Sequence, residues 1–211
     1  MMNRINVPFI DLGSQNPDSA LELGGARFNV ECVNWPETFP YAPFCNGRIA
    51  RTQDALVVDF RVSGLDLRAQ NLEDNGRQWE DSCVEVFIKD PEKDTYYNFE
   101  INALGKVLAC SGADRHGRVA RPEEEMKEIL RFGQLEGGPL DEGGIWTWRV
   151  GVVIPFKLIG INPDNLPAGI RANFYKCGDK TAHPHYLSWS PIDTPKPDFH
   201  RPEFFGELIL I

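Results

Sequence analysis

The sequence from Cys83 to Asn102 reads CVEVFIKDPEKDTYYNFEIN, and it decides the fold class. Apolar and polar residues alternate over 83–88 and again over 96–102, and Lys89-Asp90-Pro91 between them is a turn signal. Alternation with a period of two places the apolar side chains on one face of a strand and the polar ones on the other. The segment therefore predicts two β-strands, each with one buried face.

The same alternation predicts further strands at residues 145–154 and 169–175. Residues 55–62, which are rich in β-branched side chains, and residues 207–211 at the end of the chain are also predicted to be strands. One helix is predicted over 121–132, where Pro122 suits the first helical position and the run Glu123-Glu124-Glu125 complements the positive end of the helix dipole. Many short strands with a single short helix predict an all-β fold, an antiparallel β-sandwich. We expect residues 1–211 to form one domain.

Net charge narrows the class of partner. The 211 residues carry a formal charge of −9. Nucleic acids and anionic membranes select surfaces rich in lysine and arginine, so the charge argues against both. A neutral or cationic partner is expected instead, and neutral sugars satisfy that condition.

The five cysteines are Cys32, Cys45, Cys83, Cys110 and Cys177. Their odd number excludes a complete disulfide framework, and no two are spaced as in a zinc ribbon or a thioredoxin motif. Cys83 and Cys110 lie in apolar strand-like runs, where a reduced cysteine packs as a small hydrophobic residue. The pattern favours a reducing compartment.

The residues from Met1 to Asp11 contain no apolar run long enough for the core of a signal peptide. No stretch approaches the roughly 20 apolar residues that cross a bilayer, so no membrane insertion is expected. The sequence as written predicts a cytoplasmic protein. If an export signal has been removed from it, an extracytoplasmic protein is expected instead.

Three places combine a flat aromatic ring with planar polar groups, the mixture that recognises sugar rings and their hydroxyls. The first is Trp79, which stands among polar residues just before a predicted strand. The second is the polar face of the two strands in the quoted segment. The third is residues 186–191, which lie in an aperiodic stretch, 178–205, that we expect to be a long ordered and functional loop. The polar face consists of Glu85, Asn98, Glu100 and Asn102.

Other interpretations remain open. Glu85 and Glu100 could be the acid and base of a glycoside hydrolase if their separation is suitable. A protein-interaction sandwich would instead place Trp79 in its core. The histidines at 183, 185 and 200 are expected to be structural or surface groups rather than metal ligands, and Asp74-Asn75-Gly76 is expected to be a turn rather than a calcium site.

Several blocks of the sequence, taken together and in order, resemble the family 9-like carbohydrate-binding modules, in particular a subgroup of stand-alone bacterial domains. The resemblance covers most of the chain from about Arg48 onward. Its blocks are Arg68 to Ile88, Tyr96 to Asn102 with Gly105, Arg171 to Lys176, Tyr186 to Pro191, and Phe199 to Gly206.

This resemblance implies a jelly-roll-like sandwich that binds an oligosaccharide or polysaccharide without catalysis, in a role such as carbohydrate catabolism. It implies a clamp in which Trp79 and Trp189 stack on the sugar and Glu85 binds its hydroxyls. Asn98, Glu100, Asn102 and Lys176 are further candidates for ligand contacts. No cofactor is expected; modules of this family can carry structural calcium, but no residue of the sequence places such a site.

Overall fold

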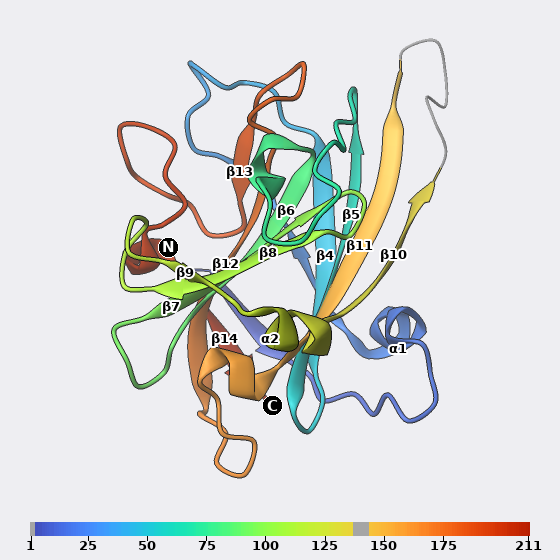
Figure 1. The fold of residues 1–211 in the computed structure, drawn as a ribbon, viewed down its shortest axis with the longest axis vertical. Coiled ribbons are helices and arrows are strands. Elements are labelled where there is room, and N and C mark those ends of the chain that lie inside the picture. The colour runs from blue at the N-terminus through green and yellow to red at the C-terminus, as the bar shows by residue number, and fades with distance from the viewer. Residues whose placement is uncertain (1–2, 137–143) are drawn as a thin grey trace.

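The fold is described from a computed structural model, which describes residues 3–136 and 144–211. Within these residues the strands form two sheets, one of nine strands and one of five, that pack as a sandwich (Figure 1). The main path of the larger sheet runs in the order β1 (Arg4–Val7), β14 (Gly206–Leu210), β12 (Gly169–Cys177), β6 (Cys83–Lys89), β7 (Tyr96–Asn102), β8 (Val107–Gly112) and β9 (Val119–Ala120). Beside β12, this sheet is extended by β13 (Tyr186–Ser188) and β3 (Cys32–Val33).

The smaller sheet runs in the order β10 (Leu130–Glu136), β11 (Trp146–Pro155), β5 (Ala55–Gly64), β4 (Phe44–Arg51) and β2 (Ala26–Asn29). Pairing is antiparallel throughout both sheets except between β1 and β14, which are parallel. The predicted all-β sandwich is confirmed, and the predicted strands are present with ends that shift by up to two residues.

The helices differ from the prediction. Residues 121–132 form a shorter helix, α2 (Glu123–Glu128), and then enter strand β10. The prediction was wrong there because the chain from Leu130 onward pairs with β11, where Leu130 lies opposite Val153. A second helix, α1 (Pro17–Gly24), was not predicted; the side chain of Asn16 caps its first turn. Among the described residues no helix has the length and apolar character needed to span a membrane.

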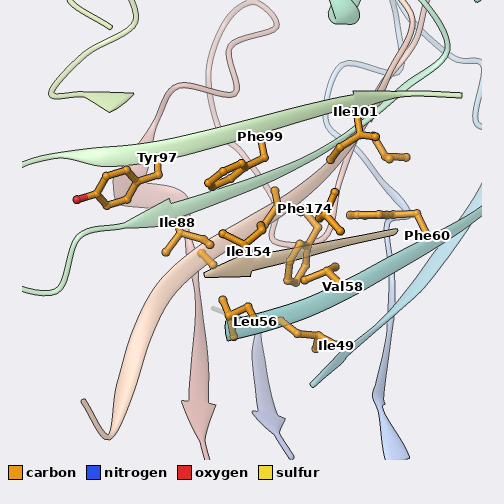
Figure 2. Close-up of a cluster of buried hydrophobic side chains, with 14 of the residues drawn as sticks. Ile49, Leu56, Val58, Phe60, Ile88, Tyr97, Phe99, Ile101, Ile154 and Phe174 are labelled. Atoms are coloured by element: carbon orange, nitrogen blue, oxygen red, sulfur yellow. The ribbon is translucent and has the colours of Figure 1, made fainter. Parts of the chain in front are cut away.

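The main core fills the space between the two sheets (Figure 2). The apolar sides of β6 and β7 face β5 and β11, as the alternation in the sequence predicts. Phe28 of β2 stacks on Phe174 of β12 across the interface, with ring centroids 4.2 Å apart. The core residues labelled in Figure 2 are Ile49, Leu56, Val58, Phe60, Ile88, Tyr97, Phe99, Ile101, Ile154 and Phe174.

The outer face of the larger sheet is also covered. A second apolar cluster there includes Phe87, Tyr96, Tyr175, Phe199 and Phe205. Much of this cover comes from the segment after β12, residues 178–205, which contains β13 and a 3₁₀ turn at Pro202–Phe204. The polar side chains of β6 and β7 thus lie under a layer of loops, and this layer leaves a pocket over Glu85 and Glu100.

Candidate functional site

The floor of the pocket is formed by adjacent strands of the larger sheet. Glu85 on β6 lies directly opposite Glu100 on β7, and Cys83 lies directly opposite Cys177 on β12. Strand alternation places all four side chains on the same, outer face of the sheet. Each is at most 3% exposed, so the face is buried and is not an ordinary solvent-facing surface.

The walls come from three loops. Trp79 stands on the short 3₁₀ turn Gln78–Glu80, the loop between β8 and β9 contributes two arginines, and residues 179–200 complete the rim. The pocket has a volume of about 280 Å³. Its lining residues are Trp79, Glu85, Glu100, Arg115, His116, Arg118, Cys177, Asp179, Tyr186, Pro197, Asp198, Phe199 and His200.

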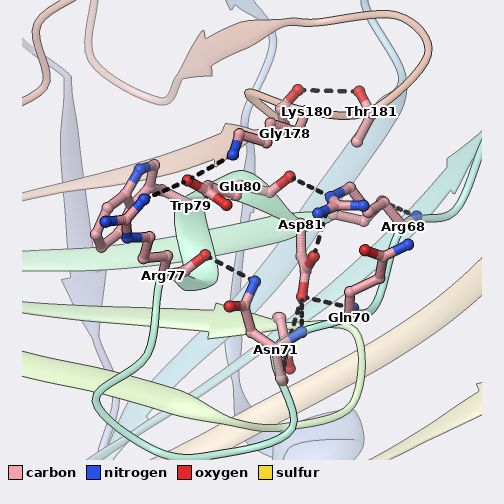
Figure 3. Close-up of polar contacts among 12 residues, drawn as sticks. Arg68, Gln70, Asn71, Arg77, Trp79, Glu80, Asp81, Gly178, Lys180 and Thr181 are labelled. Atoms are coloured by element: carbon pink, nitrogen blue, oxygen red, sulfur yellow. Dashed lines mark hydrogen bonds and ion pairs between the residues drawn. The ribbon is translucent and has the colours of Figure 1, made fainter.

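The turn that carries Trp79 is held by backbone hydrogen bonds to the segment after β12 (Figure 3). The backbone N–H of Asp179 donates to the carbonyl of Trp79 at 3.0 Å, and that of Lys180 donates to the carbonyl of Glu80 at 3.1 Å. The Lys180 ammonium also lies 3.0 Å from the Glu80 carboxylate. Trp79 is half-buried, and it packs at the edge of the outer apolar cluster while one side faces the pocket.

Asp81 fixes the loop that precedes this turn, and Figure 3 shows its contacts. Its carboxylate accepts hydrogen bonds from the backbone N–H groups of Gln70 and Asn71, at 3.0 and 2.8 Å, and lies 3.4 Å from the guanidinium of Arg68. The side-chain amide of Asn102 donates to the same carboxylate at 3.1 Å. Asn102 therefore supports the loop from below.

Burial sets the charge of the pocket floor. Burial, together with the nearby charge of Glu100, raises the pKa of Glu85 well above its usual value. Burial also raises the pKa of Glu100, to about 7, although the Arg118 guanidinium at 3.3 Å opposes the rise. Near neutral pH at least one of the two carboxyl groups is therefore protonated, so the pair can donate a hydrogen bond as well as accept one.

Other polar groups on the walls are also tuned by burial. Burial raises the pKa of Asp179. Burial and the charges of Arg118 and Arg115 lower the pKa of His200 to about 2, so its imidazole is neutral and lies 2.9 Å from the Tyr96 hydroxyl.

The seven residues predicted from the sequence fall into three groups: those that line the pocket, those behind its lining, and Trp189 and Lys176, which lie elsewhere. Trp79, Glu85 and Glu100 line the pocket. Asn98 lies beneath it, completely buried, and its amide donates to Glu100 at 3.0 Å. Asn98 and Asn102 are therefore positioned behind the lining.

The position of Trp189 contradicts the expected clamp of two tryptophans. It is only 5% exposed and belongs to the main core between the sheets, with its ring centroid 5.4 Å from that of Phe174. A side chain in this position cannot stack on a sugar in the pocket. Its polar neighbours in the sequence, Ser188 and Ser190, are buried as well, so they gave a misleading signal of exposure.

Lys176 is also displaced from the expected position. It is 1% exposed and points to the interior side of β12, where its ammonium lies 5.7 Å from the centroid of the Trp148 ring. The ammonium donates a hydrogen bond to Nε2 of His185 at 2.7 Å. Lys176 is not part of the pocket lining.

Several lining residues were not predicted as ligand contacts. Tyr186, Phe199 and His200 belong to the loop that was expected to be functional, so the lack of periodicity there was a usable signal. Arg115 and Arg118 come from a short loop after β8 that carried no such signal.

The possible metal ligands in the pocket floor can be compared with the ligands that a structural calcium ion requires. Within the described part of the chain, one group of possible metal ligands has its atoms within 4.8 Å of one another: Cys83, Glu85 and Cys177. Calcium takes oxygen ligands, so a group with two sulfurs does not fit it.

Comparisons with known proteins agree with the fold. The sequence profile described as carbohydrate-binding family 9 matches residues 18–210. The crystal structure of a protein from Bacteroides uniformis that has been proposed to bind carbohydrate is 34% identical, covers 100% of both chains and has a TM-score of 0.88. No curated protein matches the chain.

Two structures of a family 9 carbohydrate-binding module from Caldicellulosiruptor kristjanssonii share the fold at low identity. The complex with cellotriose is 12% identical, covers 99% of this chain and 93% of that one, and has a TM-score of 0.61. The complex with glucose is 13% identical, covers 99% and 96%, and has a TM-score of 0.58. Since the family profile spans nearly the whole sequence, the chain belongs to carbohydrate-binding family 9.

Proposed function

We propose that the protein binds an oligosaccharide in the pocket over β6 and β7, with Trp79 stacking on a sugar ring and the carboxyl groups of Glu85 and Glu100 binding its hydroxyls. Membership of the family supports carbohydrate as the ligand class. The observation that carries the proposal is that flat aromatic side chains and buried carboxyl groups line the same pocket.

The chemistry of the floor suits a neutral polyol. A hydroxyl group donates one hydrogen bond and accepts others, so it matches a pair of carboxyls that keep a proton between them. Oε2 of Glu100 is buried and has no hydrogen-bond partner among the described residues, while its other oxygen is bound by Asn98 and Arg118. A sugar hydroxyl would supply the missing donor.

The walls supply the apolar and the remaining polar contacts. Trp79, Tyr186 and Phe199 present aromatic surface to the pocket, and Arg115 and Asp198 add polar groups at the rim. The volume of about 280 Å³ lies near the lower end of small-molecule sites, which suits a short stretch of sugar. A more open hollow shares Trp79, Arg115 and Arg118 with the pocket, so a longer oligosaccharide has room to continue.

Binding is favoured over the glycosidase alternative by the placement of the two carboxyls. A glycosidase acid and base flank the scissile bond from two sides. Glu85 and Glu100 instead stand side by side on one floor, as cross-strand neighbours of a single sheet. Both would approach a sugar from the same direction.

The test is a glycan panel that begins with glucose and cellotriose, the ligands of the two Caldicellulosiruptor complexes. We expect isothermal titration calorimetry to give one sugar class with a Kd between about 1 μM and 1 mM. Trp79→Ala and Glu100→Gln should each weaken binding at least about tenfold, which corresponds to roughly 1.4 kcal/mol.

The matched control is Trp146→Ala, because Trp146 is a half-buried tryptophan on β11 in the opposite sheet. It should bind like the wild type. Wild-type affinity in folded Trp79→Ala, or no response to any glycan, would contradict the proposal. Release of reducing sugar by the wild type and not by Glu100→Gln would support the hydrolase instead.

A further inference from the structure

Two cysteines and one carboxylate meet at the back of the pocket. Cys83 and Cys177 are direct cross-strand partners between β6 and β12, and Glu85 follows Cys83 by two residues on the same face. One ligand atom from each, two sulfurs and one carboxylate oxygen, lie within 4.8 Å of one another. The thiol of Cys177 donates to Oε1 of Glu85 at 3.1 Å.

This donor set matches one class of metal. Thiolate sulfur selects zinc and other thiophilic ions over calcium and magnesium, and zinc accepts carboxylate oxygen beside sulfur. Tetrahedral zinc with bonds of about 2.3 Å to sulfur requires two sulfurs roughly 3.8 Å apart. A group whose ligand atoms already lie within 4.8 Å needs only small side-chain adjustments to meet that geometry.

The position of the three possible ligands relative to the pocket determines from which side a bound ion would remain accessible. Cys177 and Glu85 line the pocket, whereas Cys83 is completely buried behind them. An ion held by all three therefore has three protein ligands and one free direction, toward the pocket. Sites of this kind keep a water or a ligand in the fourth position.

We propose that Cys83, Cys177 and Glu85 bind one zinc ion whose fourth coordination position faces the pocket. The ion enters from solvent through the pocket. The two thiols, and the Glu85 carboxyl group where it is protonated, release their protons to solvent as the bonds from the metal to sulfur and oxygen form. The hydrogen bond from Cys177 to Glu85 is then replaced by coordination of both groups to the ion. This inference goes beyond sugar binding and does not depend on it.

The test uses the whole chain, freed of metal with a chelator, kept reduced with a phosphine and without sugar. Zinc is titrated in competition with a chromophoric chelator, and we expect one equivalent to bind per chain. Cobalt(II) at the same site should give the thiolate-to-metal charge-transfer absorption and the visible bands of a tetrahedral ion.

The variants assign the ligands. Cys177→Ser should lower zinc affinity by more than roughly 100-fold, beyond the 10–100-fold cost typical of losing an outer-shell partner. Glu85→Gln should weaken binding while keeping the charge-transfer absorption, because both sulfurs remain. Cys110→Ser is the matched control: Cys110 is a buried cysteine on β8 of the same sheet, outside the group, and its loss should leave zinc binding unchanged.

Circular dichroism establishes that each variant is folded, and if Cys177→Ser does not fold, the cobalt spectrum of the wild type decides alone. A reduced, folded wild type that binds no stoichiometric zinc would overturn the proposal. So would a cobalt spectrum without thiolate absorption, or wild-type affinity in Cys177→Ser. Sugar binding measured separately on the metal-free protein keeps the two proposals distinguishable.

Discussion

Glu85 and Glu100 are the residues on which the character of the pocket depends. Two neighbouring carboxyl groups away from water repel each other when both are ionised, so burial and proximity hold a proton on the pair. The Arg118 guanidinium and the Asn98 amide fix one oxygen of Glu100 and leave the other without a partner among the described residues. Such a floor favours hydroxyl groups over anions, because an anion would add to the repulsion.

The two tryptophans of the expected clamp should respond differently to truncation. Trp189→Ala removes a ring from the main core, and we expect the free energy of unfolding to fall by about 3–5 kcal/mol. Trp79→Ala removes a half-buried ring at the pocket edge and should cost less stability while weakening sugar binding. Denaturant unfolding of both variants measures the difference, and a larger loss in Trp79→Ala would show that the ring is chiefly structural.

From the sequence, residues were assigned to the site by their neighbours in the chain. This explains both the correct and the wrong assignments. Glu85 and Glu100 were placed on one face by alternation, and β-pairing brings them together. Trp189 stands between two buried serines, whose partners Asn34 and Asn173 are distant in the sequence. Cys83 and Cys177 become neighbours only through the pairing of β6 with β12, so no spacing in the sequence could reveal them.

At the scale of elements, the segment after β12 completes the rim of the pocket. Asn173 on β12 anchors it, since its side chain accepts from the N–H of Ser190 at 2.8 Å and donates to the C=O of Ser190 at 3.0 Å. This arrangement supplies for one residue the two hydrogen bonds that a neighbouring strand would give. Without it, both backbone groups of Ser190 lose their partner while buried.

We therefore expect Asn173→Ala to destabilise the protein by about 1–3 kcal/mol and to loosen the segment it anchors. Hydrogen–deuterium exchange followed by mass spectrometry should show faster exchange in peptides from residues 186–200, with β5 and β11 unchanged. Sugar affinity should fall as the rim loses order. Uniformly faster exchange across both sheets would indicate general destabilisation and would contradict a local anchoring role.

Strands were easier to predict than helices for a physical reason. A strand with one apolar and one polar face carries its period in its own residues, as residues 96–102 show, although the structure buries both faces of this strand. Helix α2 ends early because the next residues gain more by pairing with β11 than by continuing a short helix. The eight residues of α1 bury only Ala20 and Leu21, too few to give a helical period.

At the scale of the whole molecule, the larger sheet is buried on both faces, and this burial reaches ionisable groups outside the pocket lining. His185 is 2% exposed; its Nε2 accepts from the Lys176 ammonium at 2.7 Å, which leaves Nδ1 to donate to the carbonyl of His183 at 2.7 Å. Burial and the charge of Lys176 lower the pKa of His185 to about 2. The imidazole is therefore neutral in the folded protein.

This depressed pKa predicts a loss of stability in acid. Below pH 6.5, the usual pKa of histidine, the unfolded chain binds a proton at His185 that the folded protein does not bind. The stability contributed by the neutral ring is complete above that pH and is lost as the pH falls toward about 2, at up to about 1.4 kcal/mol per pH unit.

Glutamine can keep both hydrogen bonds without titrating, so His185→Gln should lose less stability between pH 7 and pH 4.5. Because the buried carboxyls are the same in both proteins, the difference between their denaturant unfolding curves isolates His185. Parallel pH dependence in the two proteins would show that the ring takes up its proton without unfolding.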